Sequence, residues 1–145
     1  MSPRLEGILP ALITPLDAGE RVNTGALERL LDRVYAAGVD GVYLCGNTGE
    51  GMALDASERR TVAEVAIRAS PPGKQVVVHV GAASLRSALD LAHHAARLGV
   101  TAISSLPPAG ISYEELLEYY RALAEASGLP VIAYYFPDLG GGALT

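Results

Sequence analysis

The sequence predicts an α/β fold built on a parallel sheet. Five short apolar runs bounded by turn residues have the length of buried strands: residues 8–14, 41–45, 76–80, 102–106 and 131–135. Four segments with helical spacing of apolar residues separate them. The runs are apolar throughout rather than at every second position, as expected when both faces of a parallel sheet are covered.

The four intervening segments are expected to lay one apolar stripe each on the sheet. The stripes comprise Leu27, Leu30, Leu31 and Val34; Val62, Val65 and Ala66; Leu89, Ala92 and Ala96; and Leu116, Tyr120 and Leu123. Three of these helices are preceded by residues suited to capping, namely Asp55, Ser84 and Ser112. Asp55 and Ser112 are each followed three residues later by a glutamate, Glu58 and Glu115. Glycines are expected to end three of the helices, namely Gly38, Gly99 and Gly128.

Composition limits the class of protein. The 145 residues suit one ordinary domain, and 50% hydrophobic with 19% charged residues suffices for a core. A net charge of -5 argues against nucleic acid as a partner. The single cysteine, Cys45, excludes an intrachain disulfide and favours a buried thiol in a reducing cytoplasm. Neither a signal peptide nor an apolar run of about 18 residues is present, so no export and no membrane contact are expected.

Two arrangements of the parallel sheet compete. A doubly wound sheet of five strands fits 145 residues as they stand, whereas a (β/α)8 barrel needs roughly 250 residues and would be cut off after its fifth strand. Length therefore prefers the open sheet. Against it, the first strand is followed by Thr-Pro-Leu-Asp at residues 14–17, without the glycine-rich turn of a dinucleotide site.

Residues 46–50, Gly-Asn-Thr-Gly-Glu, follow the second predicted strand and precede a capped helix. The backbone amides of this string and the Thr48 hydroxyl could hold a small carboxylate. The string is not a P-loop, because the spacing and the following Lys-Ser/Thr are absent. The alternative is a glycine-rich turn whose hydroxyl satisfies its own loop.

Tyr134 and Tyr135 are neighbours on the last predicted strand. Successive strand residues point to opposite faces, so only one of them can face a barrel interior while the other meets the helix layer. One is a candidate acid or base. The alternative is that both are aromatic core residues with hydrogen-bonded hydroxyls.

The remaining polar residues do not indicate a catalytic or metal-binding site. His79 lies inside an apolar strand and is expected to be a hydrogen-bonded core histidine, while His93 and His94 are expected at the surface. No His, Cys and carboxylate grouping has metal spacing, so neither a metal nor a cofactor is predicted. Lys74, the only lysine, lies in a loop that enters a strand, whereas both motifs lie where strands end.

Together, three ordered motifs resemble the superfamily of dihydrodipicolinate synthase and N-acetylneuraminate lyase, which are Schiff-base pyruvate lyases built on (β/α)8 barrels. Residues 11–15 (Ala-Leu-Ile-Thr-Pro) resemble the first-strand motif, residues 46–50 the pyruvate loop, and residues 134–137 (Tyr-Tyr-Phe-Pro) the family's Tyr-x-x-Pro. The strings at residues 49–51, 57–60, 62–64, 79–82 and 84–85 look most similar to neuraminate lyases of the animal type. The synthases carry an arginine two positions after that proline, where this chain has Leu139.

The resemblance implies that residues 1–145 form the first five strands of a (β/α)8 barrel, with no second domain. It implies a class I aldolase-type lyase in which a lysine forms an imine with pyruvate or another 2-oxo acid. Tyr134 would move the proton to or from the substrate hydroxyl, and Asn47, Thr48 and Gly49 would bind the carboxylate. The family also suggests a homo-oligomer, a tetramer.

Two departures from the family pattern affect the proton relay. Family members place Thr or Ser where this chain has Asn47, and an amide cannot relay a proton as a hydroxyl does. Many also place a tyrosine from a neighbouring subunit near the site, where this chain has Leu-Pro-Pro-Ala-Gly at residues 106–110.

The largest departure is that the imine lysine belongs on strand six, beyond Thr145. We therefore expect the 145 residues alone to be inactive. Two alternatives stay open: a dihydrodipicolinate synthase, and a non-catalytic half-barrel that self-associates through its open edge.

Overall fold

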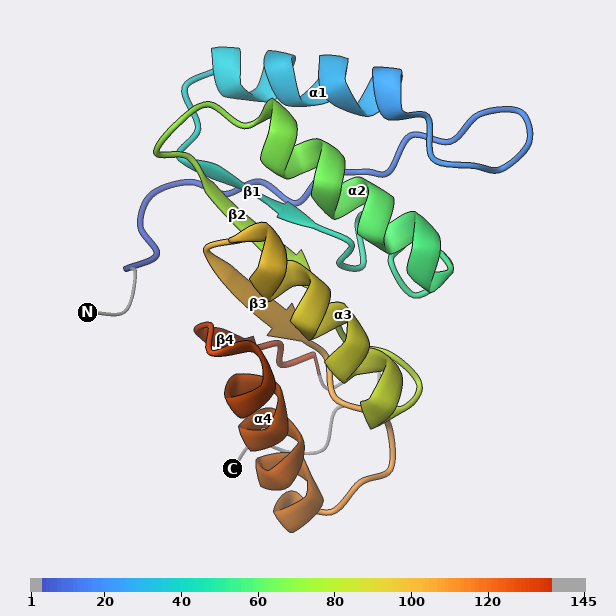
Figure 1. Ribbon diagram of the computed structural model, residues 1–145, viewed down its shortest axis with the longest axis vertical. Helices are drawn as coiled ribbons and strands as arrows, with labels where there is room; N and C mark the ends of the chain where they lie inside the picture. The colour runs from blue at the N-terminus through green and yellow to red at the C-terminus, as the bar shows by residue number, and fades with distance from the viewer. Residues whose placement is uncertain (1–3, 137–145) are drawn as a thin grey trace.

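The computed structural model describes residues 4–136, which form a four-stranded parallel sheet with its strands in chain order, β1-β2-β3-β4. Strands and helices alternate: α1 (Thr24–Ala36), β1 (Gly41–Leu44), α2 (Ala56–Ala69), β2 (Gln75–His79), α3 (Leu85–Leu98), β3 (Ala102–Ser105), α4 (Tyr113–Ser127) and β4 (Val131–Ala133). Figure 1 shows α1 to α4 following one another along the same side of the sheet. Within residues 4–136, no helix has both the length and the apolar character needed to cross a membrane.

The strand order decides between the two predicted arrangements. A doubly wound sheet reverses its strand order at a switch point and carries helices on both faces. Here each strand pairs with the next one in the chain, and consecutive helices contact one another in the same sequence. This is the order of a (β/α)8 barrel, so the doubly wound alternative is wrong.

The first predicted strand, residues 8–14, is not a strand in the structure. It pairs with β1 only at a single parallel bridge between Ala11 and Tyr43, where Leu12 N–H donates to the Tyr43 carbonyl at 2.9 Å and Tyr43 N–H to the Pro10 carbonyl at 2.9 Å. Pro10 has no N–H with which to extend the pairing. The sequence predicted an apolar extended segment in the right place, but proline leaves it irregular.

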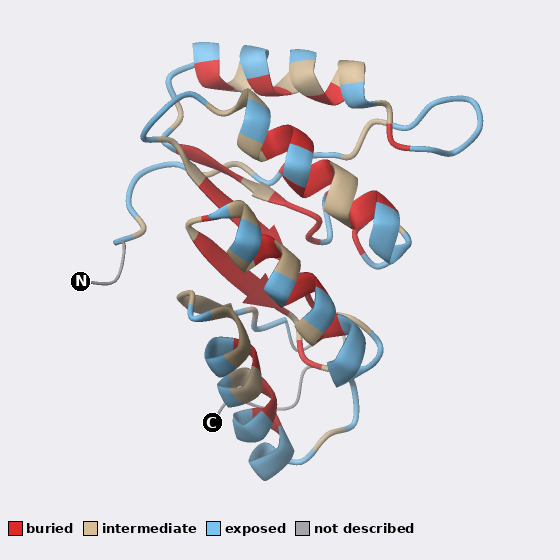
Figure 2. Ribbon diagram, viewed as in Figure 1, coloured by how far each residue is buried: buried red, intermediate tan, exposed pale blue. Residues whose placement is uncertain are grey.

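The core lies between the sheet and the helices. Its largest fully buried side chains include Leu27 and Leu31 of α1, Leu44 of β1, Ile103 of β3 and Leu123 of α4. Figure 2 shows the buried positions concentrated on the strands and on the sides of the helices nearest to them. At least some residues of each predicted apolar stripe are therefore packed towards the sheet.

The predicted caps form as expected. The side chains of Asp55, Ser84 and Ser112 accept from backbone N–H groups in the first turns of α2, α3 and α4, and Ser112 forms a full capping box with Glu115. Gly99 and Gly128 end α3 and α4 in the left-handed conformation. These local signals determine where each helix begins and ends.

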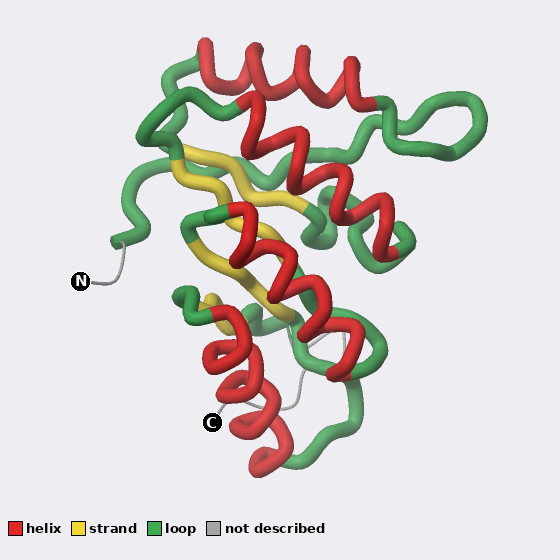
Figure 3. Tube along the Cα trace, viewed as in Figure 1, coloured by secondary structure: helices red, strands yellow, loops and turns green. Residues whose placement is uncertain are grey.

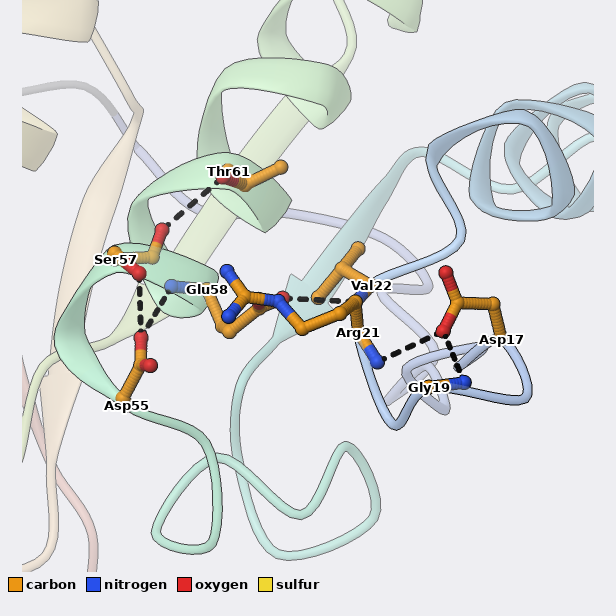
Figure 4. Close-up of polar contacts among 8 residues, drawn as sticks. All are labelled: Asp17, Gly19, Arg21, Val22, Asp55, Ser57, Glu58 and Thr61. Carbon is orange, nitrogen blue, oxygen red and sulfur yellow. Dashed lines mark hydrogen bonds and ion pairs between the residues drawn. The ribbon is translucent and has the colours of Figure 1, made fainter.

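Glu58 differs from a capping-box glutamate. Its carboxylate accepts from Val22 N–H at 2.8 Å and pairs with Arg21 Nε at 2.5 Å, instead of reaching back to Asp55 (Figure 4). The loop before α1 is closed in turn by Asp17, which accepts from the N–H groups of Gly19 and Arg21 at 2.8 and 3.1 Å. Glu58 thus ties this loop to the start of α2.

Because all four strands are parallel, the loops that follow them gather at one end of the sheet (Figure 3). The candidate motifs lie at this carboxyl end. Lys74 lies at the opposite end, where its Nζ donates to the Val39 carbonyl at 2.7 Å, as the sequence predicted.

Candidate functional site

The loop after β1 folds back on itself. Cys45 takes a left-handed conformation with φ 57° and turns the chain away from the sheet. Gly51 N–H then donates to the Gly46 carbonyl at 3.1 Å, and Glu50 N–H to the Asn47 carbonyl at 3.0 Å. The loop therefore closes as a series of tight turns.

Three consecutive amides of this loop have no acceptor of their own. The N–H groups of Asn47, Thr48 and Gly49 donate to no atom of residues 4–136. Consecutive free N–H groups in a turn can hold an anion. The structure therefore leaves donors in the loop that was predicted to hold a carboxylate.

Thr14 anchors this loop to the N-terminal segment. Its Oγ1 donates to the Gly49 carbonyl at 2.7 Å. A Cβ at Gly49 would lie 2.8 Å from the Leu12 carbonyl oxygen, closer than side-chain carbons normally approach backbone. Only glycine fits here, because the N-terminal segment packs directly on the loop.

A cavity of about 540 Å³ opens at the carboxyl end of the sheet. Its lining residues come from the loops after β1, β2 and β3 and from the chain after β4: Gly46, Asn47, Met52, His79, Ala82, Ala83, Leu106, Pro107, Pro108, Ala109 and Tyr134. None of these lining residues is acidic, so the wall described by residues 4–136 does not repel an anion.

The structure brings together two of the four predicted site residues. Asn47 and Tyr134 both line the cavity. Thr48 is exposed and Gly49 is buried against the N-terminal segment, and neither residue lines the cavity. Their contribution would therefore come from the backbone of the adjoining turn.

Tyr134 and its neighbour Tyr135 have different surroundings. Tyr134 N–H donates to the Ser105 carbonyl at 3.0 Å, which continues the pairing with β3, and its ring lies edge-on to His79 with centroids 6.2 Å apart. Tyr135 is 49% exposed and does not line the cavity. Of the two candidates, Tyr134 is the one at the site.

His79 is a hydrogen-bonded buried histidine, as predicted. It is 4% exposed, and its Nε2 accepts from the Leu106 N–H at 2.9 Å. Burial, and then the charge of Arg59, lower the pKa of His79 to about 4. The ring is therefore neutral at physiological pH, with its acceptor nitrogen already occupied.

Arg59 contacts the cavity-lining residue His79 and was not singled out from the sequence. Its Nη1 donates to the Gly81 carbonyl at 2.8 Å and its Nη2 to the His79 carbonyl at 2.7 Å. It is 4% exposed, and burial lowers its pKa. A signal was present, because Arg59 lies three residues before Val62 and so on the buried stripe of α2.

Cys45 is buried, as predicted, although it lies just past β1 rather than within the strand. Burial raises its pKa to about 11 against the opposing charge of Arg59. This thiol is protonated and unreactive at neutral pH. The described residues 4–136 also hold no group of three or more metal-ligating side chains.

The sequence matches the Dihydrodipicolinate synthetase family over residues 4–145. Among curated relatives, N-acetylneuraminate lyase of Rhizobium meliloti is 39% identical over 136 residues, covering 92% of this chain and 46% of that protein. N-acetylneuraminate lyase of Citrobacter koseri is 36% identical over 148 residues, covering 100% of this chain and 50% of that protein. The chain thus spans about half the length of these relatives.

Solved structures agree with the sequence relatives. Sialic acid aldolase of Ruminococcus gnavus superposes with a TM-score of 0.90 at 28% identity, covering 96% of this chain and 47% of that one. A prophage protein of the dihydrodipicolinic acid synthase family from E. coli K12, solved with pyruvate, superposes with a TM-score of 0.91 at 32% identity and the same coverage of 96% and 47%. The predicted partial (β/α)8 barrel is thereby confirmed. The chain belongs to the dihydrodipicolinate synthetase family, and its relatives within that family include N-acetylneuraminate lyases.

Proposed function

We propose that the cavity is the 2-oxo acid site of a Schiff-base lyase of the N-acetylneuraminate lyase type, with pyruvate as the shared reactant. One observation carries the proposal: Asn47 and Tyr134 line one cavity at the carboxyl end of a barrel sheet, and Asn47 begins a turn with three consecutive free amides. The E. coli relative was solved with pyruvate, and one of the Ruminococcus gnavus structures is a catalytic lysine mutant.

In this proposal the loop after β1 binds the substrate carboxylate. The N–H groups of Asn47, Thr48 and Gly49 donate to its oxygens, and the Asn47 side-chain amide adds a further donor from the cavity wall. Among residues 4–136, no carboxylate on the cavity wall competes for these donors. The loop keeps its shape because Thr14 and the turns of residues 46–51 hold it.

Tyr134 is the proposed proton carrier. Among residues 4–136, it bears the only hydroxyl that lines the cavity. Asn47 cannot relay a proton, and the acceptor nitrogen of His79 is committed to Leu106. Proton transfer at the substrate hydroxyl therefore falls to Tyr134 rather than to a histidine.

The imine lysine of the proposed reaction comes from outside residues 1–145. Lys74 is the only lysine within them, and it is tied to Val39 at the amino end of the sheet. A polypeptide of residues 1–145 alone would therefore bind a 2-oxo acid only noncovalently. It would be inactive as a lyase.

Borohydride reduction tests this proposal. With pyruvate present, a polypeptide of residues 1–145 is expected to yield no reduced adduct by intact mass, because Lys74 lies at the wrong end of the sheet. A protein that also carries the strand-six lysine is expected to yield one adduct per chain, on that lysine. Omitting pyruvate and replacing Lys74→Arg are the controls. An adduct on Lys74 that this replacement abolishes would contradict the assignment.

The dihydrodipicolinate synthase reaction is the alternative within the same family. The position that carries arginine in synthases is Leu139 here, which lies outside the described residues. The Rhizobium meliloti and Citrobacter koseri relatives are lyases. Both observations support the lyase function. That the protein is a cytoplasmic homo-oligomer is a separate part of the proposal and does not rest on these observations.

Self-association is the expected behaviour of residues 1–145 on their own. β4 is the open edge of the sheet, and Ile8 and Ile13 beside the opposite edge are 68% and 58% exposed. Analytical ultracentrifugation should show an average mass that rises with protein concentration, and Ile13→Lys should reduce that rise. A monomer at every concentration would count against this half-barrel behaviour.

A further inference from the structure

Two carbonyl groups at the end of β2 have lost their strand partner. Along β2, Gln75 N–H donates towards β1, to the Asp40 carbonyl, whereas Val80 N–H donates towards β3, to the Ser104 carbonyl. Strand residues alternate in the side to which they bond, so the carbonyls of His79 and Gly81 point towards β1. β1 has already turned away at Cys45, and no strand is there to receive them.

Arg59 occupies the place of that missing strand. Its two terminal nitrogens donate to these carbonyls, Nη2 to His79 at 2.7 Å and Nη1 to Gly81 at 2.8 Å. No carboxylate of residues 4–136 forms an ion pair with it. A buried cation without a charged partner is unfavourable unless hydrogen bonds compensate it. Here Nη1 and Nη2 are hydrogen-bonded, while Nε has no partner among residues 4–136. A planar guanidinium reaches two carbonyls with two separate nitrogens held in a fixed fork, whereas an ammonium offers its donors from a single nitrogen and an apolar side chain offers none.

The Arg59 contacts lead directly to the cavity wall. His79 lines the cavity, and its Nε2 accepts from Leu106 N–H, where residues 106–109 begin the wall on the β3 side. The ring also lies edge-on to Tyr134. Movement of the His79 backbone would therefore move the β3-side wall and Tyr134 together.

The His79 ring can make the Leu106 bond only in its neutral form. A neutral imidazole has one acceptor nitrogen, and Leu106 N–H occupies Nε2, so Nδ1 carries the proton. Nδ1 lies 3.4 Å from Arg59 Nη2, which is itself a donor. A second ring proton would have to go on Nε2, where it would face Leu106 N–H, and the resulting charged ring would lie beside the Arg59 guanidinium.

We propose that Arg59 is a positioning residue of the cavity: by bridging the His79 and Gly81 carbonyls, it holds the His79 ring against Leu106 N–H and so sets the wall formed by residues 106–109. That this wall shapes a 2-oxo acid site rests on the proposed function. The hydrogen-bond geometry stands without it.

The test is the N–H···N bond itself, observed by NMR in the protein that carries residues 1–145. A scalar coupling between Leu106 N and His79 Nε2 is expected in the unchanged protein. It should be lost in Arg59→Met, together with about tenfold in pyruvate affinity, the effect of one lost hydrogen bond to a charged group. Arg60→Met, which removes the same charge at the next residue of α2, should retain both.

Arg59→Lys separates bridging from charge. A lysine keeps the positive charge but offers its donors from a single nitrogen instead of a rigid fork, so it holds the two carbonyls less firmly. The coupling should therefore weaken, while His79 still titrates well below its ordinary range. His79 is faced by Arg59 from α2 and Tyr134 after β4, with Cys45 beside Arg59. In Arg59→Met, with the cation gone, His79 should titrate at a higher pH than in the unchanged protein.

Clear results would overturn the inference. The first is an unchanged Leu106–His79 coupling in folded Arg59→Met. The second is an Arg59→Lys protein that keeps the full Leu106–His79 coupling and the full affinity for pyruvate. This result tests the inference even if Arg59→Met does not fold. If the unchanged protein shows the coupling, Arg59→Met loses it, and neither binds pyruvate, the proposed function fails while the positioning role of Arg59 stands.

Discussion

Tyr134→Phe is expected to lower turnover by about 10²- to 10⁴-fold in a protein that joins residues 1–145 to the imine lysine, which is the usual contribution of a positioned acid or base. Within the described part of the chain, Tyr134 bears the only hydroxyl that lines the cavity, and no other described side chain of that wall carries one. The measurement is the rate of pyruvate release from N-acetylneuraminate. Imine formation should survive, since Phe preserves the packing against His79.

Tyr135→Phe is the matched control for this change. Tyr135 is the next residue, is 49% exposed and lies outside the cavity, so its replacement should leave turnover unchanged. Borohydride trapping in Tyr134→Phe should still give one adduct, which shows that the loss concerns proton transfer. A Tyr134→Phe protein that turns over at nearly the original rate would remove Tyr134 from the proposed mechanism.

Acidification is expected to destabilise the fold through His79. The pKa of His79 is about 4 in the folded protein and 6.5 when unfolded. Below pH 6.5 the His79 ring becomes protonated in the unfolded chain, whereas in the folded protein it stays neutral down to about pH 4. The free energy of unfolding is therefore at its full value above pH 6.5 and decreases between pH 6.5 and about pH 4. The loss amounts to roughly 3 kcal/mol, at about 1.4 kcal/mol for each pH unit between the two pKa values.

Urea unfolding at several pH values between 4 and 7 measures this effect. His79→Gln removes the titration while keeping an acceptor for Leu106 N–H, so its stability should depend less on pH than that of the unchanged protein. Equal pH dependence in the unchanged protein and His79→Gln would show that His79 is not the group responsible.

The secondary structure was largely predictable because its signals are local. Asp55, Ser84 and Ser112 cap helices within three residues of themselves, and the strand runs of residues 41–45 and 76–80 carry their own apolar pattern. The first strand was predicted wrongly. Its apolar residues are in place, but Pro10 and a single bridge to Tyr43 leave it irregular.

The candidate site was predictable only in part. The loop around Asn47 and the residue Tyr134 were identified from motifs, and the structure places both on one cavity. Their roles remain predictions. Arg59 could not be assigned a partner, because an arginine within a helix is typical of a solvated face, and its contacts with His79 and Gly81 join residues about 20 positions apart.

By itself, the sequence determined the alternation of strands and helices, the helix ends and the placement of Lys74 away from the motifs, since spacing, caps and turns act over a few residues. The tertiary structure alone decided the order β1-β2-β3-β4, the irregular first segment and the bridge from Arg59 to His79 and Gly81. Those features depend on which distant segments pack together, and one-dimensional patterns do not specify such contacts.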